Sequence, residues 1–391
     1  MPVAFIKNGF QVFLKENEFD LGAISGLMGL MLLPWTLKFL WAPLVDRVGF
    51  NKKAHRKSWI IPMQVLGTLL LVFAAFSEPQ DHLLRICILF FGYSFFCATQ
   101  DIAVDGLAVL SLNKREHGMG NSMQMGGYYL GELLGGAVLL IVLGTFGWTA
   151  TILSLAALFL LPLIPLIPFK EPQCPVDNEE RPSMKSIADW FKRNEIMWVI
   201  LLIVYTGNQV LARTLFPSLL TDRNFSETEI GQLVGIWGNG ASLVGALLGG
   251  LLMNKLGRKN SIILYSILKL AAFSLLFFLL DESLSYQKAL FVIATNDFCA
   301  GLATVALFTV MMDKCNLNRP GTDFTIQQSI NSIGILVFVI LSGTIAKAFG
   351  YGGLFYAAII IGVLSVILAL FGIKWNKVEV NGGFPEVRGR M

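Results

Sequence analysis

The chain has 391 residues, of which 55% are hydrophobic and only 14% are charged, and its mean hydropathy is +0.66. Soluble domains carry about 25% charged residues, so this composition excludes a soluble protein and predicts an all-α polytopic membrane protein. The small net charge of +4 says little about partners beyond the lipid bilayer, and we expect no nucleic acid among them.

The predicted membrane spans follow one another along most of the chain. A spanning helix needs about 20 apolar residues. Eleven stretches meet this requirement, namely residues 21–45, 58–77, 83–109, 119–143, 147–169, 195–220, 228–253, 260–280, 288–312, 323–346 and 351–373. The opening segment, residues 1–15, is too short for a twelfth span and resembles the second half of one. We therefore expect a truncated first helix, and a natural protein that begins roughly 15 to 20 residues upstream.

One long polar stretch, residues 170–194, divides the chain near its middle. Its first part is rich in proline and charge, as is typical of a linker. Ile187, Trp190 and Phe191 then predict a short helix on the membrane surface. The expected organisation is an N-terminal helical half (1–169), a cytoplasmic linker (170–194), a C-terminal helical half (195–373) and a cytoplasmic tail (374–391).

Basic residues are distributed very unequally between the two sets of loops. Of the 30 lysines and arginines, 21 lie in one set of connections and the C-terminal tail, and four lie in the opposite set. Basic loops remain on the cytoplasmic side of a membrane. The first set, together with the C-terminus, is therefore predicted to face the cytoplasm.

Two short motifs of the first half recur in the second. Ala98-Thr-Gln-Asp101 recurs as Ala294-Thr-Asn-Asp297, and the loop Asp46-Arg-Val-Gly49 recurs as Asn254-Lys-Leu-Gly257. Each match is weak alone, but both occur in the same order and at similar offsets, which indicates an internal repeat. Two parallel halves of this kind place a solute site between them near the middle of the membrane.

Three segments of the first half resemble the AmpG branch of the major facilitator superfamily. They are the stretches 33–47, 98–105 and 127–131, with the sequences LPWTLKFLWAPLVDR, ATQDIAVD and GYYLG. The branch includes muropeptide permeases, RhtX/FptX siderophore permeases and the acetyl-CoA transporter group. The resemblance implies the major facilitator fold, with two pseudo-symmetric six-helix halves, in a bacterial inner membrane. It also implies uptake of a mid-sized polar organic solute, with protons as the coupling ion.

Eight ionisable residues lie within the predicted spans or the opening segment. A charge at this depth is costly and is a candidate functional group. Equal numbers of cations and anions indicate pairing, since an unpaired buried charge is strongly unfavourable. The cations are Lys7, Lys38, Arg213 and Lys269, and the anions are Asp101, Asp105, Glu132 and Asp297. Lys269 has no obvious partner in the sequence.

Lys38 and Asp101 are the most specific predicted pair. Lys38 precedes Asp46 by eight residues, about 12 Å along a helix, and Asp101 lies at a similar depth from the same membrane face. Asp105 follows four residues later, on the same helix face as Asp101. The pair could be a static brace between helices, a proton carrier whose affinity changes when the partner leaves, or a direct substrate contact.

The loop containing Asp46, Arg47 and Gly49 matches the facilitator motif between the second and third helices. That resemblance implies a gating role, in which the carboxylate sits at the positive N-terminus of a helix of the other half in one conformation only. The alternative is an ordinary solvated turn. The second copy of the motif has Asn254 in place of the aspartate, so we expect that copy to lack charge.

Several polar residues could line a cavity, although each could equally form an interhelical hydrogen bond. They are Tyr128, Tyr129, Asn208, Gln209, Arg213, Asn239, Gln327, Gln328 and Asn331. Five cysteines without C-x-x-C spacing and three loop histidines favour neither a metal site, a cofactor nor an enzyme.

The sequence therefore predicts a monomeric secondary transporter of a small-molecule substrate. It leaves open whether that solute is muropeptide-like, siderophore-like or an acetyl-CoA-type donor. Two other function classes also remain open, a membrane-embedded enzyme and a non-transporting sensor on the same fold.

Overall fold

A computed structural model of the protein describes residues 5, 10, 21–51, 53–77, 79–172, 182–373 and 375. These residues form helices and connecting turns, with no strand among them. Eight of the described helices are long and apolar enough to cross a membrane. The predicted class, an all-α polytopic membrane protein, is therefore confirmed.

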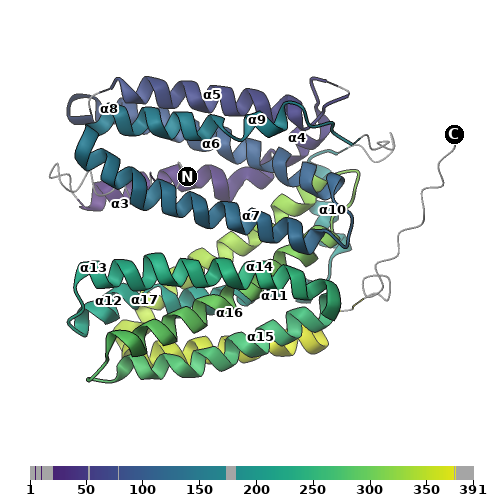
Figure 1. The fold of residues 1–391 in the computed structure, drawn as a ribbon. Helices are drawn as coiled ribbons and strands as arrows, with labels where there is room; N and C mark the ends of the chain where they lie inside the picture. The colour runs from purple at the N-terminus through teal and green to yellow at the C-terminus, as the bar shows by residue number, and fades with distance from the viewer. Residues whose placement is uncertain are drawn as a thin grey trace. The chain divides into compact units, whose positions relative to one another are not determined.

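Figure 1 shows the helices of the first sequence half and of the linker. In chain order they are α3 (Leu21–Leu37), α4 (Ala42–Arg47), α5 (Lys57–Ala75), α6 (Pro79–Ser111), α7 (His117–Glu132), α8 (Leu139–Leu160), α9 (Leu163–Leu166) and α10 (Lys185–Arg193). A 3₁₀ segment (Lys38–Leu40) precedes α4, and a π-helical segment (Leu133–Val138) joins α7 to α8.

The second sequence half is built in the same way. Its helices are α11 (Ile196–Arg213), α12 (Phe216–Asp222), α13 (Glu227–Ile230), α14 (Asn239–Leu256), α15 (Arg258–Ser274), α16 (Tyr286–Asp313) and α17 (Pro320–Ile367). A π-helical segment (Gly231–Gly238) joins α13 to α14, a 3₁₀ segment (Leu275–Leu280) follows α15, and a second π-helical segment (Leu368–Gly372) follows α17.

Each of the eleven predicted spans lies on helical residues. Two of the helices contain a glycine with non-helical backbone angles, Gly147 in α8 (φ 76°) and Gly350 in α17 (φ 68°). Glycine is the residue that adopts positive φ without steric cost. Each of these glycines lies at the boundary between two predicted spans and follows a phenylalanine, so the internal repeat extends to the backbone conformation.

The described residues fall into two compact units. Unit 1 comprises the residues up to Ser111 together with Gly126–Arg193 and Cys315–Ser332. Unit 2 comprises Leu112–Met125, Asn194–Lys314 and the residues from Ile333 onward. The first turns of α7 therefore belong to unit 2, whereas the first turns of α17 belong to unit 1.

The core of unit 1 lies between α5, α6 and α8. Its packing is aromatic, with the rings of Tyr93 and Phe159 5.3 Å apart and those of Phe10 and Phe90 5.0 Å apart, both edge to face. Phe5 and Phe10 are fully buried in this core. The rest of the predicted half-helix, including Lys7, lies outside the described residues.

In unit 2, α14 and α15 both pack against α16 (Figure 1). Small residues bring the backbones close together, since a Cβ atom on Gly249 would lie 3.1 Å from the Cα atom of Leu302. Cβ atoms on Gly245 and Gly301 would likewise overlap backbone atoms of the facing helix. This close approach places Asp297 of α16 beside the beginning of α14.

The predicted helix of the linker is present as α10, with Trp190 buried and Phe191 exposed. Its position on a membrane surface stays a prediction. Residues 173–181 of the linker lie outside the described part of the chain. At the end of α10, Arg193 donates a 2.7 Å hydrogen bond to Asp323 in the first turn of α17, so the linker is attached to the segment of α17 that belongs to unit 1.

Candidate functional site

Lys38 lies at a break between two helices. The α-helix α3 ends at Leu37, and α4 begins at Ala42 with Pro43 in its first turn. Proline has no backbone N–H, and its ring disfavours helical geometry in the residues before it. The interruption at 38–41 therefore follows from the sequence, and it directs the Lys38 side chain into unit 1, where the side chain is only 4% exposed.

The Lys38 ammonium group has two polar partners. It forms an ion pair with Asp101 of α6 and donates a 2.5 Å hydrogen bond to Oε1 of Gln328 on α17. It also lies 5.5 Å from the ring centroid of Trp35. The Asp101 side chain is 26% exposed, whereas the Lys38 side chain is enclosed. We call Lys38, Asp101 and Gln328 the first charge cluster.

Other predicted residues of unit 1 lie in different surroundings. Asp105 is buried one helical turn beyond Asp101 on α6. Tyr128 and Tyr129 of α7 pack edge to face with their ring centroids 5.4 Å apart, and Glu132 is half-buried at the end of that helix. On α17, Asn331 is buried, and the buried amide of Gln327 donates to the backbone oxygen of Asp323 at 3.1 Å.

A second charge cluster lies in unit 2, where Nε of Arg213 is 3.0 Å from a carboxylate oxygen of Asp297. The same guanidinium donates to Oδ1 of Asn239 at 3.1 Å and to the carbonyl of Val234 at 3.3 Å. Gln209 donates to Asp297 at 3.5 Å. The Arg213 side chain is 33% exposed, whereas Asp297 is buried. The structure thus joins Gln209 and Arg213 of α11 to two predicted residues far from them in the sequence, while Asn208 is also buried on α11.

The backbone of the π-helical segment before α14 leaves room for the Asp297 carboxylate. The π-helical segment 231–238 ends at Gly238, and a Cβ atom at that position would overlap the Asp297 carboxylate. Segments of π-helix occur frequently at functional sites. Asp101 and Asp297 are the matching residues of the repeated motif, so each sequence half pairs the same carboxylate with a cation. The cations come from different helices of the repeat.

Lys269 does not follow the pairing expected from the sequence. Its ammonium group donates to the carbonyl oxygen of Tyr205 and lies 4.4 Å from the centroid of the Tyr205 ring. No carboxylate pairs with it among the residues that the structure describes. The sequence offered no partner for Lys269, and in the structure a carbonyl oxygen and an aromatic face take the place of an anion.

Lys269→Met should leave transport unchanged and raise the midpoint of thermal unfolding. The lysine is only 2% exposed and pairs with no carboxylate among the described residues, so an apolar side chain of similar volume removes the cost of burying a charge without stranding an anion. Unfolding followed by intrinsic fluorescence gives the midpoint, and Lys38→Met, which removes a paired cation, is the matched control. Loss of transport in a well-folded Lys269→Met protein would instead assign this lysine a functional role.

The Asp46 carboxylate binds the beginning of α17 within unit 1. It accepts hydrogen bonds from the backbone N–H of Thr322 at 2.6 Å and of Gly321 at 3.2 Å. The first residue of α17, Pro320, has no N–H to satisfy, so these are among the donors that a helix N-terminus leaves free. Arg56 forms an ion pair with the same carboxylate, which is fully buried. We call this contact the Asp46 latch.

Gly321 is required for the Asp46 latch to close. A Cβ atom at this position would lie 2.7 Å from Oδ1 of Asp46 and 2.9 Å from the carbonyl oxygen of Ile102. Of the two neighbours predicted with Asp46, Arg47 is exposed and Gly49 packs against the ring of His55. The cation of the latch is therefore Arg56, which the sequence motif did not identify.

A second carboxylate strengthens the same helix start. Asp323 accepts hydrogen bonds from Arg193 at 2.7 Å and from the backbone N–H of Asn316 at 2.9 Å, and Arg319 lies 3.6 Å away. The sequence analysis missed these residues. The available signal was Pro-Gly-Thr-Asp at 320–323, since proline at the first helical position and an acidic residue in the first turn are typical of a helix start.

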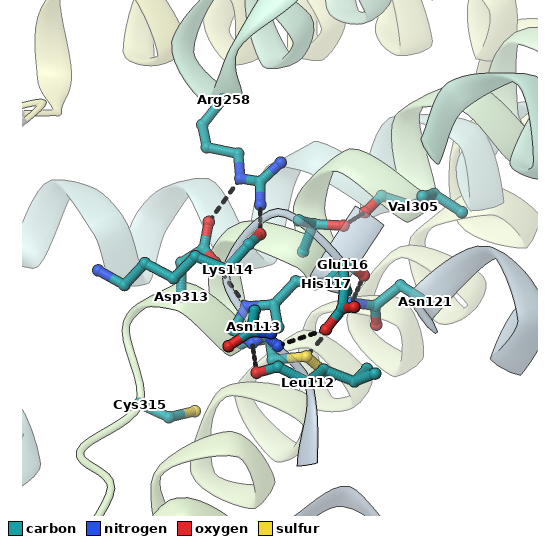
Figure 2. Close-up of polar contacts among 12 residues, drawn as sticks. Leu112, Asn113, Lys114, Glu116, His117, Asn121, Arg258, Val305, Asp313 and Cys315 are labelled. Carbon is teal, nitrogen blue, oxygen red and sulfur yellow. Dashed lines mark hydrogen bonds and ion pairs between the residues drawn. The ribbon is translucent and has the colours of Figure 1, made fainter. Parts of the chain in front are cut away.

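A related cluster holds the beginning of α7 in unit 2, as Figure 2 shows. Nε of Arg258 lies 2.7 Å from one oxygen of Asp313, and Nδ1 of His117 lies 2.6 Å from the other. The second loop copy has asparagine at position 254, yet the cluster at the start of α7 contains a carboxylate. The carboxylate absent at Asn254 is supplied by Asp313, at the end of a different helix.

Comparison with known proteins gives a consistent result over nearly the whole chain. The profile of the Major Facilitator Superfamily matches residues 3–335 and 197–389. The anhydromuropeptide permease of Escherichia coli K12 is 28% identical over 392 residues, which cover 97% of this chain and 79% of the permease. The putative transporter AmpG 4 of Rickettsia felis is 25% identical over 389 residues, covering 95% of this chain and 93% of that protein.

Two solved structures share the fold. A crystal structure of the fucose:proton symporter FucP of Escherichia coli matches with a TM-score of 0.71 and 14% identity, over 95% of this chain and 96% of that one. A bacterial homologue of the iron transporter ferroportin, in an outward-facing state, matches with a TM-score of 0.69 and 15% identity, over 94% and 96% of the two chains. These two likenesses establish the architecture, and the resemblance to AmpG transporters is confirmed by the sequence relatives.

Proposed function

The chain belongs to the major facilitator superfamily, and from this premise we propose that this secondary transporter carries an anhydromuropeptide-like solute into the cytoplasm together with protons. The observation that carries the proposal is the similarity to an anhydromuropeptide permease over 97% of the chain. The two charge clusters supply chemistry suited to such a solute.

Arg213 supports recognition of a polar, anionic solute. A sugar joined to a peptide presents hydroxyls, amides and carboxylates. Arg213 has five N–H donors, of which Asp297, Asn239 and the carbonyl of Val234 engage only part, and its side chain is 33% exposed. The donors that these contacts leave can hydrogen-bond to a carboxylate, hydroxyl or amide oxygen of the solute.

Asp101 is the proposed proton carrier. Its carboxylate is balanced by Lys38, and Lys38 has a second acceptor in Gln328 that can hold it when the pair separates. A carboxylate that loses its cation in a region of low dielectric constant binds a proton more readily. Separation of the pair during the transport cycle would therefore couple proton uptake to movement of the solute.

The Asp46 latch is the proposed gate. Its bonds join the end of α4 to the first turn of α17, and both lie at the membrane face that the basic loops assign to the cytoplasm. In this proposal the latch is closed in one conformation and broken in the other. The protein acts as a monomer in a bacterial inner membrane, with its C-terminal tail in the cytoplasm.

Uptake by right-side-out membrane vesicles tests the substrate and the coupling together. We expect a labelled anhydromuropeptide to accumulate when the exterior is made acidic, to leave when a protonophore is added, and to be recovered chemically unchanged. Unlabelled anhydromuropeptide should compete, whereas a ferric siderophore and acetyl-CoA should not. Competition by the siderophore or by acetyl-CoA would indicate that the substrate is of the kind carried by another group of the AmpG branch. Accumulation insensitive to the protonophore would contradict proton coupling.

A further inference from the structure

The first turn of α7 is fixed by a chain of polar contacts within unit 2, drawn in Figure 2. Nδ1 of His117 lies 2.6 Å from one oxygen of Asp313, and Nε of Arg258 lies 2.7 Å from the other oxygen. Arg258 also donates to the carbonyl oxygen of Lys114 in the loop before α7. His117 is only 4% exposed, so these contacts are shielded from water.

The second ring nitrogen of His117 is also placed against an acceptor. Nε2 lies 3.2 Å from the carbonyl oxygen of Leu112. A neutral imidazole donates at one nitrogen and accepts at the other, whereas an imidazolium donates at both. An ionised Asp313 and the Leu112 carbonyl are both acceptors, so against them the doubly protonated ring donates at both nitrogens and satisfies both contacts. The geometry thus favours a proton on His117 as long as Asp313 is ionised.

This imidazolium depends on Asp313. His117 is the first residue of α7, and a cation is unfavourable near the positive N-terminus of a helix. Asp313 of α16 supplies the compensating charge, and Arg258 of α15 orients it. The proton on His117 and the contact with Asp313 therefore stabilise each other.

The other carboxylate beside His117 in the chain is engaged elsewhere. Glu116 accepts the backbone N–H of Asn113 at 2.8 Å, and Lys114 takes part through its carbonyl. Lys314, which follows Asp313, lies with its ammonium group 5.1 Å from the ring centroid of Trp198. The ionisable partner of His117 is therefore Asp313.

The segment held by His117 continues directly onto α14. A Cβ atom on Gly118 would lie 3.0 Å from the carbonyl oxygen of Gly250, and Oγ of Ser122 donates to the carbonyl oxygen of Ala246 at 2.7 Å. These contacts pack the start of α7 closely against α14. If His117 separates from Asp313, the first turn of α7 loses the contact that fixes its end, next to the region where α7 packs on α14.

Two helix starts are thus held in the same way, one in each unit. At α17, a carboxylate between an arginine and the helix start binds backbone N–H groups, which do not titrate. At α7, a carboxylate between an arginine and the helix start binds a histidine, a residue type that can gain or lose a proton in the physiological range. We propose that His117 and Asp313 form a pH-sensitive latch, closed when His117 is protonated and released when the proton is lost.

The direction of the effect follows from linkage. The closed latch binds a proton that the released latch does not retain, so its stability is present at low pH and is lost as the pH rises. One linked proton changes the ratio of closed to released protein by at most about tenfold per pH unit. The loop that contains His117 lies in the set assigned to the cytoplasm. The latch would therefore make transport respond to the pH inside the cell, an effect that rests on the proposed transport function.

Nuclear magnetic resonance of protein labelled with ¹⁵N in its histidines tests the protonation state directly. The chain has only three histidines, so His55→Gln and His82→Gln assign the His117 signals by elimination. We expect His117 to show two protonated nitrogens in acidic buffer and to become neutral more readily in Asp313→Asn. Identical titration of His117 in the wild type and in Asp313→Asn would overturn the proposal.

Distance measurements between spin labels then test the latch itself, without any solute. Labels at the exposed positions 115 and 255, in a cysteine-free protein in nanodiscs, report on separation of the α7 start from α14. We expect the long-distance population to rise with pH, by up to about tenfold per unit. His117→Arg should keep the short distance throughout, and His117→Gln should lose the pH dependence.

His55→Gln is the matched control, because His55 contacts the backbone carbonyl oxygen of Val45 at 2.9 Å and forms no ion pair with a carboxylate among the described residues; it should behave like the wild type. A pH response that persists in His117→Gln, or that is absent from the wild type, would contradict the latch. Since neither measurement involves a solute, a negative result would contradict the latch without bearing on the proposed substrate.

Discussion

Asp101→Asn should destabilise the protein by about 3–5 kcal/mol, the usual cost of removing one member of a buried ion pair. The substitution leaves the Lys38 ammonium group enclosed, with the Gln328 oxygen as its remaining acceptor. Because that acceptor persists and Asp101 is 26% exposed, we expect a value at the lower end of the range. The midpoint of thermal unfolding in detergent provides the measurement.

The double variant Lys38→Met with Asp101→Asn separates the possible roles of the pair. Removing both charges should restore most of the lost stability, since no uncompensated cation remains. A static brace would then also recover proton-driven uptake. A proton carrier would recover stability and solute exchange but not accumulation against a gradient. A double variant that is no more stable than Asp101→Asn would show that the two residues do not act as a pair.

Asp46→Asn should shift the conformational equilibrium by up to about 2 kcal/mol, or about 30-fold, away from the latched state. An asparagine oxygen can still accept one N–H from Gly321 or Thr322, but it does not balance the buried guanidinium of Arg56. The protein should insert and fold normally, because the penalty applies only while the latch is closed. Slower transport with unchanged expression is the expected result.

Gly321→Ala disrupts the same contact without changing any charge, because the added Cβ atom would press on Asp46 and on the carbonyl of Ile102. It should slow transport in the same direction as Asp46→Asn. Arg47→Gln is the matched control, since Arg47 is exposed and lies next to Asp46 in the sequence. Equal transport by all three variants and the wild type would leave the Asp46 latch without a gating role.

Helical geometry made part of this site predictable. The rise per residue placed Lys38 and Asp101 at the same depth, and the cost of an unpaired charge in the membrane favoured their contact. The repeated motif similarly directed attention to Asp297. These inferences need only regular helices and a fixed membrane thickness, both of which the composition implies.

The two latches were less accessible to sequence reasoning. The Asp46 carboxylate accepts hydrogen bonds from the backbone N–H groups of Gly321 and Thr322. Every residue except proline has a backbone N–H, so a sequence does not show which of them a carboxylate will bind. Arg56 rather than Arg47 reaches the carboxylate because the loop folds back on itself, and a motif does not specify that path. His117 and Asp313 lie nearly two hundred positions apart, so only the packing of α7 onto α14 and α16 reveals their contact.

Solute counterflow is the decisive test of secondary transport by this chain. Purified protein is reconstituted into liposomes that are loaded with unlabelled anhydromuropeptide and diluted into a trace of the labelled compound, with no ion gradient. A secondary transporter exchanges the two, so label should accumulate transiently inside, and Asp101→Asn should retain this exchange if Asp101 carries the proton. An enzyme or a non-transporting sensor on the same fold would give no overshoot, and its absence in well-folded wild-type protein would contradict transport of this solute.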